Sequence, residues 1–202
     1  CVFHWDDATP AQGVHRCFAV VAQADRPRPA LSDMTVMQNG LMGETGLRRT
    51  MPHWPQPGLI PRDPARGDRL ETIAYFGSDQ YEPQFVKTGA FQDALRQRGV
   101  RFVNRFQGEW HDYQHVDAVL AIRDCPPVVL ATKPASKLIN AWKAGVPALL
   151  GPEPAYRELR TSPLDFLEAA SAEAVLDSID RLQQESGLYR RMTEHGGRKP
   201  LT

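Results

Sequence analysis

Short apolar runs alternate with segments of helical periodicity over most of the chain. Apolar runs typical of buried strands lie at 72–76, 100–103, 116–122, 146–150 and 166–170. Apolar residues recur at helical spacing over 83–98, 134–144, 155–159, 172–184 and 186–195. Gly99 and Gly145 end two of these helical segments, where a glycine can adopt a positive φ. The alternation predicts an α/β, doubly wound domain with a mainly parallel sheet and helices on both faces.

The first part of the chain has a weaker pattern. Residues 1–50 contain two apolar runs, 18–22 and 34–37, and we expect them to form a short additional N-terminal α/β segment. Residues 51–67 contain five prolines and two glycines, which exclude a helix or a central strand. We therefore divide the chain into an N-terminal segment (1–50), a proline-rich linker (51–69) and a main domain (70–197). Trp54, Leu59 and Ile60 indicate that the linker packs against its surroundings.

Composition limits the classes of partner. The 202 residues include 24 basic and 24 acidic side chains, so the formal net charge is zero and nothing favours a nucleic acid as partner. The three cysteines have no metal-binding spacing, which favours a reducing compartment. Since no apolar run is long enough to cross a membrane and no signal peptide is visible, we expect a cytoplasmic protein without a transmembrane segment.

Several residues that suit a phosphate group follow the predicted strands. Gly77 and Ser78 come directly after the strand at 72–76, and Arg123 follows the run at 116–122. Lys133 and Lys137 flank the first turn of the predicted helix 134–144, where the helix N-terminus favours an anion. Ligands of doubly wound folds bind at the carboxyl ends of the strands. These five residues are therefore candidates for an anion site, although a tight turn and solvent-facing cations would explain them as well.

Other polar residues give weaker indications. Asn140 lies one turn after Lys137 and could bond a ribose hydroxyl, and Glu153 could contact a sugar or cap a helix. His111 and His115 have the spacing of two helical metal ligands, but no third ligand is evident, so no metal is expected. The sequence contains neither a phosphate-binding P-loop nor a nucleophile elbow, and it assigns no catalytic group.

The assembled motifs resemble the C-terminal, donor-binding half of the GT-B glycosyltransferases. The segment KLINAWKAGVPALLGPEPAYREL is similar to the helix–turn–strand signature of that superfamily. The segments IAYFGS, FLEAAS and LYRRMTEHG resemble its first strand with the glycine loop and its closing elements. The resemblance covers about residues 70–197 and implies a Rossmann-like domain that binds a sugar nucleotide. Residues 1–69 would then hold part of the acceptor-side half and the interdomain linker.

The resemblance implies a glycosyltransferase that moves a sugar from a nucleotide-diphospho-sugar to the hydroxyl of a small molecule or glycan. The sugar nucleotide would be a substrate, and no cofactor is expected. Arg123, Lys133 and Lys137, with Gly77 and Ser78, become candidates for the diphosphate, while Asn140 and Glu153 become candidates for the ribose or sugar. Asn140 stands where the family has a ribose-binding glutamate, and Ser136 stands where fucosyltransferases have an acidic residue. The alternative is a non-catalytic binding or scaffold module with a degenerate glycosyltransferase-like fold.

Overall fold

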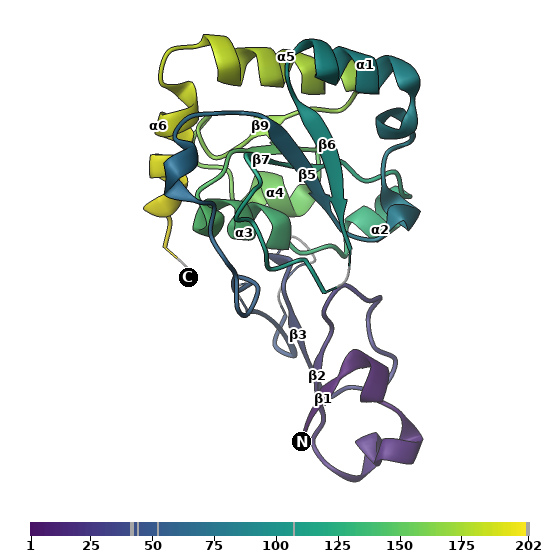
Figure 1. Cartoon of the computed structure of the whole chain (residues 1–202). Coiled ribbons are helices and arrows are strands. Elements are labelled where there is room, and N and C mark those ends of the chain that lie inside the picture. Colours follow the sequence, from purple (N-terminus) through teal and green to yellow (C-terminus); the bar gives the residue numbers. More distant parts are fainter. Residues whose placement is uncertain (41–42, 44, 52, 107, 201–202) are drawn as a thin grey trace.

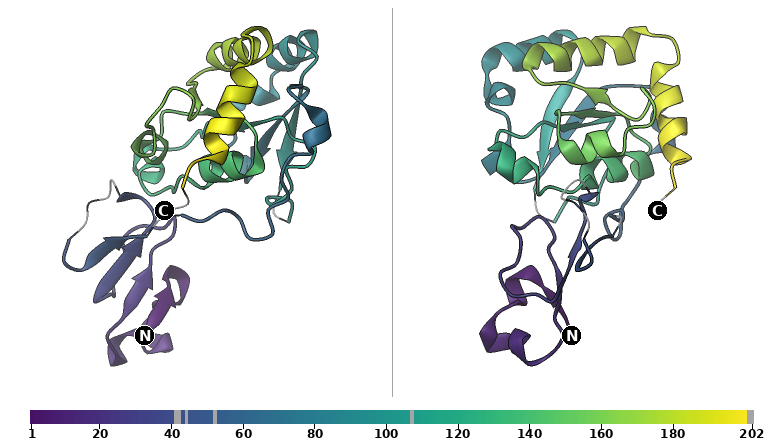
Figure 2. Two further views of the ribbon diagram at one scale, coloured as in Figure 1. Left: turned by 90° about the vertical axis from the view of Figure 1, so that its left-hand side faces the viewer. Right: turned by 180° about the vertical axis from the view of Figure 1, so that it is seen from behind.

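A computed structural model describes residues 1–40, 43, 45–51, 53–106 and 108–200 of the chain. Its architecture consists of two parallel sheets, one of four strands and one of five (Figure 1). The five-stranded sheet lies inside the larger, C-terminal body, and the four-stranded sheet projects from it (Figure 2). This confirms the predicted α/β class, and it places a second small sheet at the N-terminus.

The five-stranded sheet has the order β6-β5-β7-β8-β9. Its strands are β5 (Thr72–Phe76), β6 (Arg101–Arg105), β7 (Ala118–Ala121), β8 (Ala148–Leu150) and β9 (Leu167–Glu168). All neighbouring strands are parallel. After β5 the chain moves outward to β6 and then returns to the opposite side of β5 to form β7. The carboxyl ends of β5 and β7 therefore form a topological switch point, which is where such sheets bind ligands.

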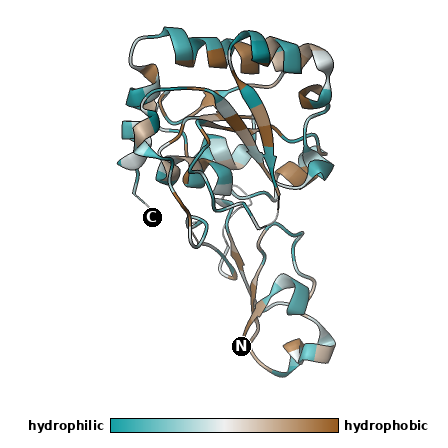
Figure 3. Ribbon diagram, viewed as in Figure 1, coloured by the Kyte–Doolittle hydropathy of each residue, from teal (hydrophilic) through white to brown (hydrophobic). Residues whose placement is uncertain are grey.

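Helices cover both faces of this sheet because its strands are apolar on both sides. Ile73 and Leu120 face one apolar cluster, to which α1 (Gly89–Gln97), α5 (Ala172–Gln184) and α6 (Leu188–Gly197) contribute. Ala74 and Val119, their neighbours in the chain, face a second cluster with α3 (Ser136–Ala144) and α4 (Pro154–Glu158). This is the period-two alternation of a strand buried on both faces. Figure 3 shows the corresponding concentration of apolar residues on the central strands.

The N-terminal sheet has the order β1-β2-β3-β4 and is also parallel. Its strands are β1 (Val2–His4), β2 (Val20–Ala22), β3 (Met34–Met37) and β4 (Arg48–Thr50). The apolar runs predicted β2 and β3, but β1 and β4 were not predicted. The sequence of β4 is Arg-Arg-Thr, and its extended backbone is fixed by pairing with β3 instead of by an apolar pattern. Short 3₁₀ turns connect β1 to β2: Trp5–Asp7, Pro10–Gln12 and Val14–Arg16.

Helix starts differ most from the predicted bounds. The segment 83–98 forms a 3₁₀ turn (Gln84–Lys87) before α1 begins, because the Thr88 side chain accepts a hydrogen bond from the Phe91 N–H and caps the helix at that point. The helix predicted from residue 134 starts at Ser136, and a short helix, α2 (Pro127–Leu130), precedes it without having been predicted.

Of the three apolar linker residues that were expected to pack against the rest of the protein, one does and two are exposed. Leu59 packs against the second apolar cluster, but the Trp54 side chain is 71% exposed and Ile60 is also exposed. The linker is held instead by Arg62, whose guanidinium reaches the buried carboxylate of Asp117 at 2.8 Å. A 3₁₀ turn, Pro64–Arg66, follows Arg62 and leads into β5.

Candidate functional site

A cavity of about 370 Å³ opens at the carboxyl ends of β5 and β7, and we call it the β5–β7 cavity. Its volume falls within the range of small-molecule sites, roughly 300–1,000 Å³. Its wall combines the loop after β5, Arg123 after β7 and the start of α3 with residues of the N-terminal segment and the linker. The lining residues are Ala24, Asp25, Gln38, His53, Gln56, Tyr75, Phe76, Gly77, Ser78, Tyr81, Trp110, Arg123, Lys133, Pro134, Ser136, Lys137 and Asn140.

The cavity brings together six of the seven candidate residues from the sequence. Gly77, Ser78, Arg123, Lys133, Lys137 and Asn140 all line it. Glu153 lies behind this wall, where its carboxylate forms an ion pair with Arg123, and its side chain is only 2% exposed. Glu153 is therefore the one candidate that does not line the cavity, and its expected contact with a sugar stays a prediction.

Lys133 and Lys137 occupy different electrostatic surroundings. The Lys133 ammonium pairs with the Asp25 carboxylate at 2.8 Å and lies 5.4 Å from the centre of the Tyr81 ring. The Lys137 ammonium lies 5.6 Å from the centre of the buried Tyr75 ring. Burial lowers the pKa of Lys137 well below its usual value, and the neighbouring Arg123 charge lowers it further. A bound anion next to Lys137 would favour the protonated, charged form of this side chain.

Arg123 and Glu153 form a buried pair at the inner side of the cavity. The Arg123 side chain is only 5% exposed, and its guanidinium lies 5.9 Å from the centre of the Tyr156 ring. Burial raises the pKa of Glu153, and the charges of Arg123 and Lys137 offset part of that rise. The Oε1 atom of Glu153 is buried and makes no hydrogen bond with any residue that the structure describes. The carboxylate is thus incompletely satisfied.

Gly77 and Ser78 shape the loop after β5. A Cβ atom at Gly77 would lie 3.1 Å from the Tyr75 ring, so a larger residue would press on the aromatic side chain next to Lys137. The Ser78 hydroxyl accepts a hydrogen bond of 3.2 Å from the Gln80 N–H and caps a 3₁₀ turn, Asp79–Tyr81. Together they hold the loop close to the strand end and leave its surface open to the cavity.

The start of α3 also faces the cavity. Among the described residues no side chain caps this helix, and its first residues, Ser136 and Lys137, line the cavity, so the positive end of the helix dipole lies beside it. One turn later, the Asn140 side-chain oxygen accepts a hydrogen bond of 2.8 Å from the Gln56 N–H of the linker. Asn140 is only 6% exposed, and this hydrogen bond joins the linker to the cavity wall.

Several cavity residues were not identified from the sequence. Asp25, Gln38 and His53 come from the N-terminal segment and the linker, where no periodic pattern places them next to α3. Tyr75 and Trp110 could have been suspected as aromatic residues close to strand ends. The Trp110 indole N–H donates to the Arg105 carbonyl at 3.0 Å, which fixes the ring at the end of β6.

Among the residues described here, no cluster of three or more histidine, cysteine, aspartate or glutamate side chains is arranged to hold a metal ion. In the segment 111–117, Asp117 is buried and bound to arginines of the linker. Within the same part of the chain, no helix has both the length and the apolar character that a membrane span requires.

Comparison with known proteins gives a match at the level of structure. No protein-family model and no curated protein sequence matches the chain. HepE from Anabaena in complex with UDP-glucose matches 96% of this chain and 72% of its own, with a TM-score of 0.68 and 10% identity. The structure of HepE with UDP and glucose covers 92% of this chain and 69% of the HepE chain, with a TM-score of 0.65 and 11% sequence identity. Sucrose-phosphate synthase from Thermosynechococcus elongatus matches 96% and 67%, with a TM-score of 0.60 and 12% identity.

These likenesses concern the fold, because the sequence identities are low. The chain has a GT-B glycosyltransferase-like fold with Rossmann-like architecture, as the resemblance of its motifs predicted. The match extends over both sheets, since more than nine-tenths of the chain is covered in each case.

Proposed function

We propose that this chain binds a nucleotide-diphospho-sugar in the β5–β7 cavity and is the donor-binding part of a glycosyltransferase. The observation that carries the proposal is the convergence of Arg123, Lys133 and Lys137 with the uncapped N-terminus of α3 on one cavity at the switch point of the sheet. HepE, which shares the fold, has been crystallised with UDP and with UDP-glucose.

The charge balance of the cavity suits a diphosphate. Among the described residues, two carboxylates pair with these three cations: Asp25 with Lys133 and Glu153 with Arg123. A bound diphosphate would compete with Asp25 for Lys133 and would place negative charge next to Lys137, which forms no ion pair with the described residues. During transfer, negative charge develops on the leaving diphosphate, and preorganised cations stabilise it most effectively in a site with little water. The chain's own cations fill this role in our proposal, which includes no metal.

The other candidate residues have supporting roles in this proposal. Gly77 and Ser78 would allow the phosphates to approach the backbone after β5. Asn140 would contact the ribose through its amide nitrogen, which donates, while its oxygen accepts the hydrogen bond from the linker N–H. Glu153 would act through Arg123 by fixing the guanidinium, instead of touching the sugar itself.

Calorimetric titration tests the binding step directly. UDP, GDP, ADP and UDP-glucose would each be titrated into the whole chain at low and moderate salt. We expect at least one nucleoside diphosphate to bind, with an affinity that falls as the salt concentration rises, because the contacts are ionic. Absence of binding for every nucleotide would overturn the proposal.

A second candidate function is a non-catalytic module that binds a sugar nucleotide. Asn140 favours it, because it replaces the glutamate that the family resemblance leads one to expect and is engaged with the linker. Incubation with radiolabelled UDP-glucose and a panel of sugar acceptors separates the two functions. Formation of a glycosylated product supports the transferase, whereas tight donor binding with no product and no release of glucose supports the binding module.

A further inference from the structure

The N-terminal segment places a carboxylate on one of the cations of the β5–β7 cavity. Asp25 and Lys133 both line this cavity, and their side chains form an ion pair at 2.8 Å. The Thr132 hydroxyl donates a hydrogen bond of 3.2 Å to the Asp25 carbonyl, so the backbone is held at the same place. Burial alone would raise the pKa of Asp25, but the hydrogen bond and the charge of Lys133 lower it, so the carboxylate is ionised at neutral pH.

The backbone next to this ion pair is strained. Ala24 has a φ of 51°, and among the residues that the structure describes it is the one non-glycine residue with a positive φ. The Cβ atom of an L-residue comes too close to the backbone in this region, so the conformation persists only where neighbouring contacts maintain it. Asp25, the next residue, makes such contacts with Thr132 and Lys133. Loss of these contacts would let Ala24 return to a favourable, negative φ.

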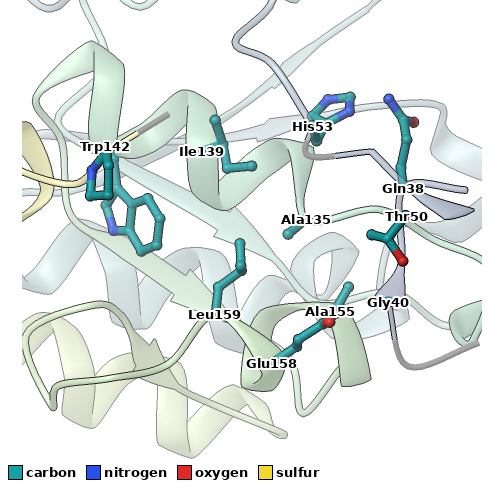
Figure 4. A pocket seen from close by; sticks show the side chains of 11 residues that line it. Gln38, Gly40, Thr50, His53, Ala135, Ile139, Trp142, Ala155, Glu158 and Leu159 are labelled. Atoms are coloured by element: carbon teal, nitrogen blue, oxygen red, sulfur yellow. The ribbon is translucent and has the colours of Figure 1, made fainter. Parts of the chain in front are cut away.

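The N-terminal part of the chain also packs incompletely against the start of α3. A cavity of about 150 Å³ lies between them (Figure 4). Gln38 and His53 come from the N-terminal segment and the linker, and Ala135 and Ile139 lie opposite them. Because Gln38 and His53 also line the β5–β7 cavity, this loosely packed contact adjoins the ion pair. A shift of the N-terminal segment here would therefore break few apolar contacts.

We propose that the ion pair between Asp25 and Lys133 is an autoinhibitory contact, the Asp25 latch, which a phosphate group displaces when it binds Lys133. The proposal rests on the proposed function, because the displacing group is the diphosphate of the nucleotide sugar. In the free protein the latch is closed, and the apparent affinity for the ligand is reduced by the fraction of molecules in which it is closed. Displacement releases residues 23–26 from the cavity wall and so links occupancy of the cavity to the position of the N-terminal segment.

Calorimetric titration of UDP and of inorganic pyrophosphate into the whole chain tests the latch. Asp25→Asn removes the competing charge, and we expect both ligands to bind about fivefold more tightly. Asp7→Asn, at an exposed position of the same segment, gives the same change in net charge and leaves both affinities unchanged. In a Lys133→Met background the gain from Asp25→Asn disappears, because the latch acts through Lys133. A gain of equal size in that background would show a general charge effect and would overturn the latch.

Two uncharged substitutions act on the latch in opposite directions. Thr132→Val removes the hydrogen bond to the Asp25 carbonyl, and we expect it to strengthen the binding of UDP about threefold. Ala24→Gly relieves the backbone strain of the closed latch, so the closed form becomes more stable and the binding of UDP weakens about threefold. The latch is wrong if Thr132→Val fails to strengthen the binding of UDP or if Ala24→Gly strengthens it.

Hydrogen–deuterium exchange followed by mass spectrometry measures the release itself. In the closed form the Arg26 N–H donates to the Gln23 carbonyl at 3.1 Å. A bound ligand usually slows exchange around its site, but the latch predicts faster exchange in the peptide that contains residues 23–26 when UDP is bound. Unchanged or slower exchange in that peptide overturns the inference and leaves the proposed function intact. Absence of binding of both UDP and pyrophosphate overturns the proposed function, and the inference with it.

Discussion

The two ends of the five-stranded sheet each contain a buried arginine paired with a carboxylate, but the two pairs differ in how completely they are satisfied. At the amino ends of the strands, Arg62 pairs with Asp117, whose side chain is fully buried. At the carboxyl ends, Arg123 pairs with Glu153, whose side chain is 2% exposed. The residue types and the burial are nearly the same, so the surrounding hydrogen bonds decide what each pair can do.

The Asp117 network is closed. The carboxylate accepts hydrogen bonds from the Arg62 and Arg66 guanidinium groups at 2.7–2.9 Å and from the Glu71 and Thr72 N–H groups at 2.9 Å. The remaining Arg62 nitrogens donate to backbone carbonyls, Gly67 at 2.7 Å and Arg69 at 3.0 Å. A network with every group satisfied fastens the linker to the sheet and has no capacity left for a ligand.

The Glu153 network is open. One carboxylate oxygen has no hydrogen-bond partner among the described residues, and nearby Lys137 has a lowered pKa. Buried groups that remain unsatisfied in a protein are costly, and a functional role is one of the reasons why they persist. In our proposal, the amino edge of the sheet therefore contributes stability and its carboxyl edge binds the ligand.

The largest expected effect is the loss of Asp117. Asp117→Ala leaves the Arg62 and Arg66 charges near the protein interior without their partner, and we expect the free energy of unfolding to fall by about 3–5 kcal/mol. Urea unfolding measures this change. The control is Asp180→Ala, which removes a partly exposed pair with Arg98 and costs about 1 kcal/mol or less. Equal losses for the two variants would contradict the distinction between closed and exposed pairs.

Lys137→Met has the second-largest expected effect, and it acts on binding instead of stability. Removing a charge-assisted contact to the diphosphate weakens the binding of UDP by about 2 kcal/mol, which is a roughly thirtyfold loss of affinity. The free energy of unfolding stays the same or rises, because a desolvated amine that forms no ion pair with the described residues is replaced by an apolar chain of similar length. Calorimetry and urea unfolding measure the two quantities. Lys143→Met, on the exposed last turn of α3, is the matched control.

If Lys137→Met lowered the stability and left UDP binding intact, the carboxyl edge would be a structural site like the amino edge. The comparison between the two edges would then fail at its central point, whatever the activity of the protein.

A feature of the fold or of the candidate site could be predicted from the sequence where neighbouring residues alone determine it. Strand β5 and helix α5 have the predicted bounds, since their apolar periods are strong and continuous. Strands β1 and β4 were missed because pairing with a distant strand, not an apolar pattern, defines them. Within the site, Gly77 and Arg123 follow strand ends and could be placed at the ligand edge from the strand order that such folds share.

The remaining site residues could not be placed in this way. Asp25 and His53 reach the cavity through loops whose path depends on how the N-terminal segment packs on α3. The sequence places Glu153 after β8, but only the side-chain geometry shows that it is buried and paired with Arg123. The apolar periodicity predicts which helices and strands pack together. Which of their side chains line the cavity and which are buried beneath them depends on the packing of the whole fold.

The smallest expected effect concerns protons, and it tests the open network most directly. In the free protein, burial and Arg123 lower the pKa of Lys137, while Glu153 and Asp25 oppose part of that shift and Lys133 adds to it. A bound diphosphate raises the pKa again, so binding takes up a proton between the two values. UDP affinity therefore falls as the pH rises through that range, by at most about tenfold per pH unit. Calorimetry in buffers of different ionisation enthalpy detects the uptake. In Lys137→Arg, which stays charged, the uptake disappears, and the same uptake in both proteins would show that Lys137 is not the group that the ligand completes.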